Sequence, residues 1–190
     1  MKILIASLSL IISLLSPLSA SATSMLPISM EQLSIRSSLI IYAQAINNEV
    51  REDPQSKQIA TFTTFKVIEV IKGSAGETHT IKQIGGKLKD SNRTLRIHGV
   101  PEFIAGEEYV VFLPEKSSLG FSSPLGLHQG SFTVTTIDGE QVVTNGRNLS
   151  APAPQLNRNS HIPLAVRADK PSQSRLSDFI NTVRSYNTEE

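Results

Sequence analysis

"IATFTTFKVIEVIK", residues 59–72, is the stretch that decides the fold class of this chain. It is rich in Thr, Phe, Val and Ile, the residue types that suit a pleated, half-buried strand. Successive side chains of a strand point to opposite faces, and this divides the apolar residues into two groups: Phe65, Val67 and Ile71 on one face, and Phe62, Ile68 and Val70 on the other. Because both faces are apolar, we expect a central strand, or a strand that bends and changes face in a barrel.

Further strands are expected at close spacing on both sides of this stretch. A β-rich run over residues 39–46 precedes it and is expected to end at Asn47-Asn48. The later strands are expected at 78–84, 94–98, 108–113, 126–136 and 140–144. Asp138-Gly139 accepts the positive φ angles of a type I′ turn, which predicts a hairpin between the last two strands. The pattern predicts a mainly β protein, a small and partly open antiparallel β-barrel of the OB-like type.

A short helix is expected before the first strand. Ser29-Met30-Glu31-Gln32 has the form of a capping box, in which the serine hydroxyl accepts from a backbone N–H and the glutamine side chain reaches back. This predicts a helix over about residues 30–37, with Met30 and Leu33 facing inward.

An amphipathic helix is expected at the C-terminal end, at 173–186, where it would pack on the barrel. Its apolar residues follow a helical stripe: Leu176, Phe179, Ile180 and Val183. Ser174 or Ser172 can cap its first turn. The expected organisation is a signal peptide at 1–22, a β-barrel domain at 23–145, a proline-rich irregular segment at 146–172 and this helix.

Residues 1–22 have the features of a secretory signal peptide. Lys2 supplies a positive start, residues 3–15 form an apolar run, and Ala20-Ser21-Ala22 offers the small-x-small pattern that signal peptidase accepts. We expect cleavage after Ala22 or Ala20. The apolar run is shorter than the roughly 20 residues that a membrane-spanning helix needs, and this disfavours the alternative of a retained membrane anchor.

The composition narrows the compartment and the class of partner. The chain has no cysteine, so disulfides, thiolate nucleophiles and cysteine-ligated zinc are excluded. An exported protein that is held together by packing alone fits the bacterial periplasm or the outside of a bacterium. The chain has 18 basic and 17 acidic residues, and removal of Lys2 with the signal peptide would leave them in balance. This balance argues against nucleic acid or an anionic membrane as the main partner.

The stretch "IKGSAGETHTIKQIGGK", residues 71–87, raises the question of a phosphate-binding loop. Such a loop requires the pattern G-x-x-x-x-G-K-[ST], because its backbone amides surround the phosphates and its hydroxyl binds magnesium. Here Ile81 stands in place of the first glycine, and Leu88 in place of the hydroxyl. We therefore interpret residues 73–76 as a turn between two strands, and Gly85-Gly86 as the end or a bulge of the second strand.

No residue is assigned a catalytic, cofactor-binding or metal-binding role from the sequence, and we expect no cofactor. Glu107 and Glu108 are adjacent carboxylates, but neighbours on a strand point to opposite faces and would not converge on one substrate. The histidines do not have the spacing of metal ligands: His79, His98, His128 and His161. A cluster of histidines in space, or a serine site without a local motif, stays open.

Four short motifs lie in order between Phe65 and Phe132. They are VIEVIKG at 67–73, GG at 85–86, GVPEFIAGEEYVVFL at 99–113 and GLHQGSF at 126–132. This set resembles a family of uncharacterised exported bacterial proteins. More distantly, the arrangement is similar to netrin-like modules and to the N-terminal domain of tissue inhibitors of metalloproteinases, which are OB-type barrels. That similarity implies a binding or inhibitory role, although those inhibitors chelate zinc through an N-terminal cysteine that this chain does not have.

Three functional hypotheses follow. The first is an exported, non-catalytic β-barrel that binds another protein, for instance a secreted protease; it would not be an enzyme and would leave the membrane once its signal is cleaved. The alternative is a small-molecule or glycan-binding barrel, although the chain has no tryptophan and three tyrosines to stack on sugars. The third is a hydrolase, for which His98 or His128 would have to lie beside a serine and a carboxylate in one cleft. The oligomeric state is left open.

Overall fold

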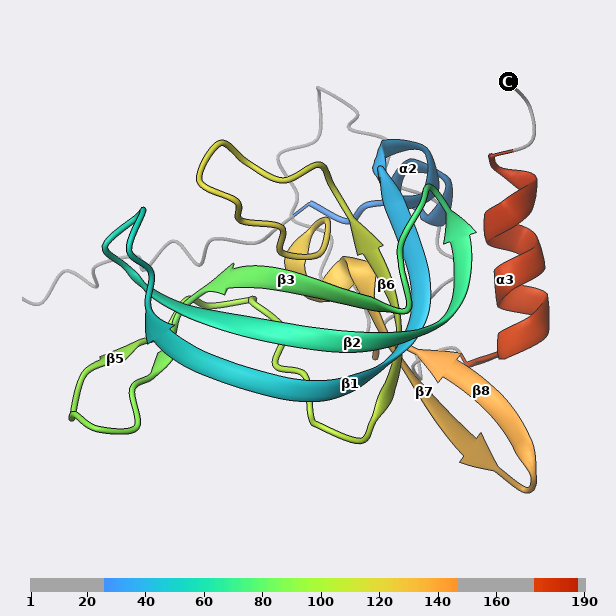
Figure 1. The fold of residues 1–190 in the computed structure, drawn as a ribbon. Helices are drawn as coiled ribbons and strands as arrows, with labels where there is room; N and C mark the ends of the chain where they lie inside the picture. The colour runs from blue at the N-terminus through green and yellow to red at the C-terminus, as the bar shows by residue number, and fades with distance from the viewer. Residues whose placement is uncertain (1–25, 147–172, 188–190) are drawn as a thin grey trace, which may run out of the picture.

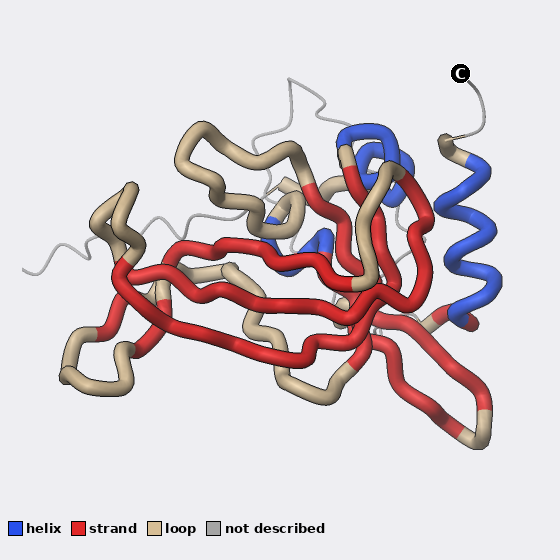
Figure 2. Tube along the Cα trace, viewed as in Figure 1, coloured by secondary structure: helices blue, strands red, loops and turns tan. Residues whose placement is uncertain are grey.

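A single bent antiparallel sheet dominates the structure, a computed structural model that describes residues 26–146 and 173–187 (Figures 1 and 2). The strand order within these residues is β3-β2-β1-β6-β7-β8-β9. The bounds are β1 (Leu39–Glu52), β2 (Ile59–Lys72), β3 (Thr78–Ile84), β6 (Glu108–Leu113), β7 (Ser131–Ile137), β8 (Glu140–Thr144) and β9 (Ser174–Arg175). A separate ribbon pairs β4 (Gly86–Lys87) with β5 (Thr94–Leu95). The mainly β prediction is confirmed.

The sheet does not close on itself. Its edge strands β3 and β9 are not paired with each other in the described part of the chain, so the sheet is bent but is not a closed barrel. Asp138 and Gly139 have φ angles of 52° and 81°, and they form the predicted hairpin turn between β7 and β8. No helix among the described residues has the length and apolar character needed to cross a membrane.

The short N-terminal helix is confirmed as α2 (Met30–Arg36). Both bonds of the capping box are present: the Gln32 amide donates to Ser29 Oγ at 3.1 Å, and the Ser29 amide donates to Gln32 Oε1 at 3.2 Å. Leu33 is buried and Met30 packs against the same core, as predicted. The helix therefore begins where its side chains satisfy the free N–H groups.

The C-terminal helix is α3 (Leu176–Ser185), and all four residues of its predicted stripe are buried. The prediction that Ser174 caps it is wrong. Ser174 is paired with Val143 in the sheet, and its hydroxyl donates to the Arg175 carbonyl. The strand pairing thus holds Ser174 outside the helix. Ser172, the signal peptide at 1–22 and most of the proline-rich segment at 146–172 lie outside the described residues.

The two faces of the sheet carry separate apolar cores. The helix-side core lies beneath α2 and α3 and consists of Leu33, Ile40, Tyr42, Val110, Phe112, Phe132, Val134, Val143, Leu176, Phe179, Ile180 and Val183. The groove-side core lies on the other face and consists of Leu39, Ile41, Ala43, Ala45, Phe65, Ile81, Phe103, Tyr109, Val111 and Leu113. Alternate residues of β1 and β6 enter alternate cores, as the period of a strand requires.

β2 has the predicted bounds, but the division of its apolar residues between two faces is wrong near its end. Tyr42 pairs with Glu69 and Ala43 pairs with Val67, so Ile68 is an extra, bulged residue. The bulge moves Val70 to the side of Val67, against the groove-side core. A further register shift lets Ile71 pack against the helix-side core. The alternative expectation of a strand that bends and changes face is the better description.

The first strand was predicted to end at Asn47-Asn48, and this is wrong. β1 continues through both residues to Glu52, with Ile46 bulged between the pairs Ala45–Phe65 and Asn47–Thr64. The continuation is possible because Asn48 finds hydrogen-bond partners from elsewhere in the chain. The preference of asparagine for turns is outweighed here by the hydrogen bonds of Asn48 with Thr63 and Phe103.

Two other predicted strands are shorter than expected. The predicted strand at 126–136 begins only at Ser131, because Gly126 and Leu127 have left-handed φ angles of 59° and 58° and residues 127–130 form the 3-10 helix η1 (Leu127–Gly130). The predicted strand at 94–98 is reduced to β5, and the chain from 96 onward leaves the ribbon.

Candidate ligand-binding groove

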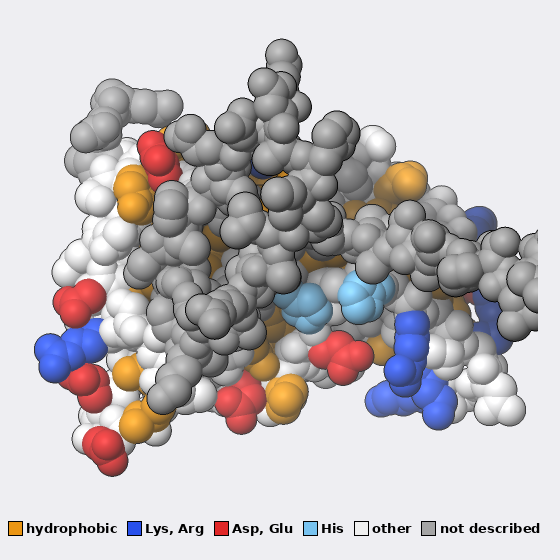
Figure 3. Space-filling model, turned by 180° about the vertical axis from the view of Figure 1, so that it is seen from behind, with side chains coloured by type: hydrophobic (Ala, Val, Ile, Leu, Met, Phe, Trp, Pro, Cys, Tyr) orange, Lys and Arg blue, Asp and Glu red, His pale blue; other side chains and the backbone are white. Residues whose placement is uncertain are grey.

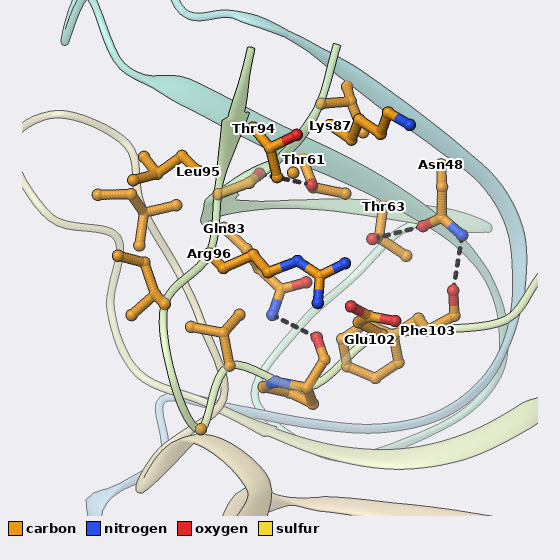
Figure 4. A pocket seen from close by; sticks show the side chains of 18 of the residues that line it. Asn48, Thr61, Thr63, Gln83, Lys87, Thr94, Leu95, Arg96, Glu102 and Phe103 are labelled. Atoms are coloured by element: carbon orange, nitrogen blue, oxygen red, sulfur yellow. Dashed lines mark hydrogen bonds between the residues drawn. The ribbon is translucent and has the colours of Figure 1, made fainter. Parts of the chain in front are cut away.

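A groove of about 640 Å³ opens between the end of the β1–β2–β3 sheet and the segment that follows β5 (Figure 4). The strands form one wall, the β4–β5 ribbon forms one end, and residues 96–103 form the other wall. Its volume is in the range of ligand sites in proteins. The lining residues are Asn48, Val50, Thr61, Thr63, Gln83, Ile84, Gly85, Gly86, Lys87, Thr94, Leu95, Arg96, Ile97, His98, Gly99, Val100, Pro101, Glu102 and Phe103.

Three polar side chains at the base of the groove hold its two walls together. The Asn48 amide donates to the Phe103 carbonyl at 2.7 Å, and Asn48 Oδ1 accepts from the Thr63 hydroxyl at 2.7 Å (Figure 4). The Gln83 amide donates to the Pro101 carbonyl at 3.2 Å. Asn48 is half-buried, whereas Thr63 and Gln83 are 0% and 2% exposed, so a missing hydrogen bond would be costly at the latter two side chains. The groove is therefore fixed in shape before any ligand arrives.

The glycines of the 71–87 stretch form one corner of this groove. Gly85 lies between the last residue of β3 and Gly86, the first residue of β4, and its carbonyl accepts from the Thr61 hydroxyl at 2.7 Å. A Cβ on Gly86 would stand 2.5 Å from Val50 Cγ1 and 2.7 Å from Thr61 Oγ1, so only glycine fits between the two strands. No helix follows Lys87, and the stretch is a strand end, a turn and a return strand, as interpreted from the sequence.

The rim of the groove carries charge of both signs. Figure 4 shows the Arg96 guanidinium extending over the base of the groove toward the Glu102 carboxylate, and no ion pair joins the two in the described residues. The β4–β5 hairpin, residues 86–96, has one acidic residue, Asp90, and otherwise basic charge: Lys87, Lys89, Arg93 and Arg96, all exposed. Lys and Arg side chains gather at this end of the molecule in the view from behind (Figure 3). One end of the groove is thus basic.

Glu107 and Glu108 do not converge, as the sequence predicted. Glu107 is exposed, whereas Glu108 accepts a hydrogen bond from the Tyr42 hydroxyl on the helix side of the sheet. Gln141 donates to the same Tyr42 oxygen at 2.9 Å. Burial, together with the nearby Glu108 carboxylate, raises the pKa of Tyr42 to about 12, so this phenol stays protonated. The hydrogen bonds of Tyr42 thus connect β1 with Glu108 of β6 and Gln141 of β8.

The histidines are only partly brought together. His98 lines the groove, and the backbone N–H of His128 donates to the carbonyl of the neighbouring residue Gly99 at 3.2 Å. Two histidine side chains are visible on the face of the molecule that Figure 3 shows. His79 lies on β3, where burial and then Lys116 lower its pKa. His161 lies outside the described residues. Within residues 26–146 and 173–187, no group of His, Asp and Glu side chains is placed to hold a metal, and no serine lines the groove.

A buried ion pair on the other face of β3 was not anticipated from the sequence. Lys82 Nζ lies 3.0 Å from Asp53 Oδ2, and both side chains are at most 10% exposed. The ammonium also lies 4.5 Å from the ring centroid of Phe121. Hydrogen bonds from Ser56, and then from Lys82, lower the pKa of Asp53 to about 2. The pair ties the β1–β2 turn to β3.

Gly85, Gly86, His98 and the motif that begins at Gly99 were noted in the sequence, but the polar residues Asn48, Thr61, Thr63, Gln83 and Arg96 were not singled out as a site, although one signal was present. Thr61 and Thr63 occupy the positions that share a face with Phe65, so a polar end to an apolar strand face could be read from the alternation. The first strand was expected to end at Asn47-Asn48, so Asn48 was not expected to contribute from within a strand. Arg96 has no local signal, because its role depends on where the chain goes after β5.

No protein-family model matches this chain, and no relative is found among the characterised proteins. The resemblance to exported bacterial proteins and to netrin-like modules therefore stays a prediction.

Proposed function

We propose that this protein is an exported, non-catalytic binding module that holds a segment of a partner protein in the groove. The observation that carries the proposal is the groove itself, whose walls are joined by the hydrogen bonds of Asn48, Thr63 and Gln83. A site that is fixed in advance loses less conformational entropy when a ligand binds. Such a shape favours recognition.

The hydrogen bonds of the Thr61 and Thr63 hydroxyls favour binding over catalysis as the role of the groove. A hydroxyl nucleophile needs an adjacent base to take its proton. The Thr61 and Thr63 hydroxyls donate instead to the oxygen atoms of Gly85 and Asn48. These side chains serve the architecture of the groove.

A protein partner is favoured over a glycan by the rings and charges near the groove. Phe103 is the aromatic residue of the lining, and its ring packs edge-on against Phe65 and Tyr109 with centroids 4.9 Å apart in each case. Phe103 is 6% exposed, so its ring offers almost no surface on which a sugar could stack. The basic hairpin at residues 86–96 instead suits an acidic surface on a protein.

Two further parts of the proposal rest on the sequence. The features of residues 1–22 support export, with removal of this segment after Ala22 or Ala20. The ordered motifs at 67–132 support an OB-type relationship for the bent sheet, and with it a binding or inhibitory role toward a partner such as a secreted protease.

A groove-filling variant tests the proposal. Ile97 lines the groove and is 41% exposed, whereas Ile137 lies at the β7–β8 hairpin and is 43% exposed, so Ile97→Trp and Ile137→Trp form a matched pair. The full chain is screened by thermal shift against pools of random peptides, glycans and small organic acids. We expect peptides to raise the Tm of the wild type and of Ile137→Trp, and to leave that of Ile97→Trp unchanged.

The other outcomes count against the proposal. A response to glycans or organic acids alone would overturn the choice of a protein partner. Hydrolysis of an ester, peptide or glycoside substrate that is lost in Ile97→Trp and kept in Ile137→Trp would overturn the non-catalytic role. No response in any pool would overturn binding at the groove.

A further inference from the structure

The outer edge of β1 is unpaired along its second half. β6 pairs with β1 only over residues 39–44, and Ala45 then exchanges backbone hydrogen bonds with Gly106 and Glu107. From residue 46 to 52, β1 has backbone hydrogen bonds with β2 alone in the described part of the chain. Backbone groups of an antiparallel strand alternate in direction, so about half of those in 46–52 point away from β2. These are open donors and acceptors.

The groove runs beside this free edge. Asn48 and Val50 of β1 contribute to its lining, and the opposite wall is the non-helical, unpaired segment 96–103. The two walls are joined at the Asn48–Phe103 hydrogen bond. The structure therefore places an extended backbone edge next to a preformed groove, the arrangement in which a peptide can add as a further strand.

The charged side chains of Glu49 and Arg51 lie away from the free edge of β1. Charged residues on an edge commonly block added strands. Arg51 lies over the ring of Phe62 at 3.7 Å from its centroid, and it pairs with Glu49 at 3.0 Å. Phe62 is on β2, so both charges are drawn onto the outer face of the β1–β2 pair, away from the groove. The backbone edge stays accessible.

The charge beside this edge indicates what the added strand carries. Arg96 extends over the groove and has no ion-pair partner among the described residues, while Arg93 of the same hairpin pairs with Glu52 at 2.8 Å. Lys87 and Lys89 add exposed positive charge at the same end. A carboxylate side chain in the groove would meet the Arg96 guanidinium with two parallel donors.

We propose that an extended, acidic segment of the partner protein adds as a strand to residues 47–52 of β1, with an acidic side chain in contact with Arg96. This proposal rests on the proposed function, because it describes how the same groove takes its protein partner. Main-chain hydrogen bonds to β1 supply affinity, and the Arg96 contact supplies preference for acidic sequences.

The test uses a phage-displayed library of random linear peptides selected on the full chain. We expect the selected peptides to be enriched in Asp and Glu. N-methylation of one peptide amide at a time should weaken binding at alternate positions, because only every second amide faces β1. Methylation effects without this alternation, or peptides without acidic residues, would overturn strand addition.

A pair of charge variants tests the side-chain contact. Arg96→Gln should raise the Kd of the selected peptides at least about tenfold, since it removes a charge-assisted bond. Arg36→Gln removes an exposed arginine of α2 and should leave the Kd unchanged. An equal rise in Kd for the two variants would mean that only the net charge of the protein matters, and it would overturn the proposed contact between Arg96 and the acidic side chain. If the library yields no binding peptide at all, the proposed function is wrong. If peptides bind but neither the N-methylation pattern nor the Arg96→Gln effect is seen, the proposed function stands and only strand addition with the Arg96 contact is wrong.

Discussion

The two faces of the sheet are completed in different ways. On the helix side, the rings of Phe112 and Phe132 pack against Phe179 of α3, and the three ring centroids lie 4.9 to 6.3 Å apart. On the groove side, the apolar core ends at Phe103, and a floor of hydrogen-bonded polar side chains continues beyond it. The helix side is closed for stability. The groove side uses polar contacts to hold a space open, so we expect function there.

The largest effect should come from removing a ring of the helix-side core. Phe112 is fully buried, and Phe112→Ala should lower the free energy of unfolding by about 3–5 kcal/mol, as for other buried phenylalanines. Phe103→Ala should cost less, about 3 kcal/mol, because the wall of the groove can partly collapse into the space. Urea denaturation of both variants measures the difference.

Hydrogen exchange separates the two variants further. Phe103→Ala should speed exchange of the amides in 96–103 without speeding it in α3, because Phe103 anchors that wall. Phe112→Ala should raise exchange throughout by lowering global stability. A larger loss of stability in Phe103→Ala than in Phe112→Ala would show that the groove-side core is the main one and would contradict the comparison.

A glycine pair gives the next effect. Gly86 and Gly106 both have positive φ, 134° and 95°, but a Cβ on Gly106 would meet nothing within 4 Å. Gly106→Ala should therefore cost only the backbone strain of a positive φ, about 1–2 kcal/mol. Gly86→Ala adds the clash with Val50 and Thr61 and should cost about 2–3 kcal/mol. Thermal unfolding of the two variants provides the measurement. Equal losses of stability would mean that Val50 and Thr61 can move to accommodate a Cβ at residue 86 without cost.

Much of the sheet could be predicted from the sequence where pattern and local chemistry agree. β2, β3, β6 and β8 have their predicted bounds, because β-rich runs are bounded there by glycine, by Asp138-Gly139 or by the loop at 53–56. β1 was predicted too short, since the partners that hold Asn48 in a strand, Thr63 and Phe103, are far away in sequence. Bulges such as that at Ile68 also have no local signature, so the change of face within β2 could not be located.

The groove could not be predicted, because its residues come from five strands and a loop. Asn48, Thr63 and Gln83 are ordinary polar residues until the fold brings them to one floor. Arg96 becomes notable only because the chain leaves the ribbon at that point. The pair of Asp53 and Lys82 likewise depends on β3 passing beside the turn after β1. Residues that act through long-range juxtaposition leave no periodic signal.

A pH-dependent effect is expected at that ion pair, which lies on the face of β3 opposite to the groove floor. The pKa of Asp53 is lowered in the folded state to about 2, so its carboxylate stabilises the fold above the ordinary pKa of an aspartate. That contribution is lost as the pH falls through about 2. Urea unfolding between neutral pH and pH 2 should show Asp53→Asn less stable than the wild type at neutral pH, with the gap narrowing in the acid range.

An exposed ion pair provides the matched control for this pH dependence. Glu49 and Arg51 are 59% and 43% exposed, and Glu49→Gln should leave the acid dependence close to that of the wild type because solvent screens the pair. Asp53→Asn should differ, because the buried Lys82 ammonium then has no counter-charge, although the ring of Phe121 remains beside it. Identical acid profiles for the two variants would mean that the buried pair adds nothing specific, and that the turn after β1 is held by packing alone.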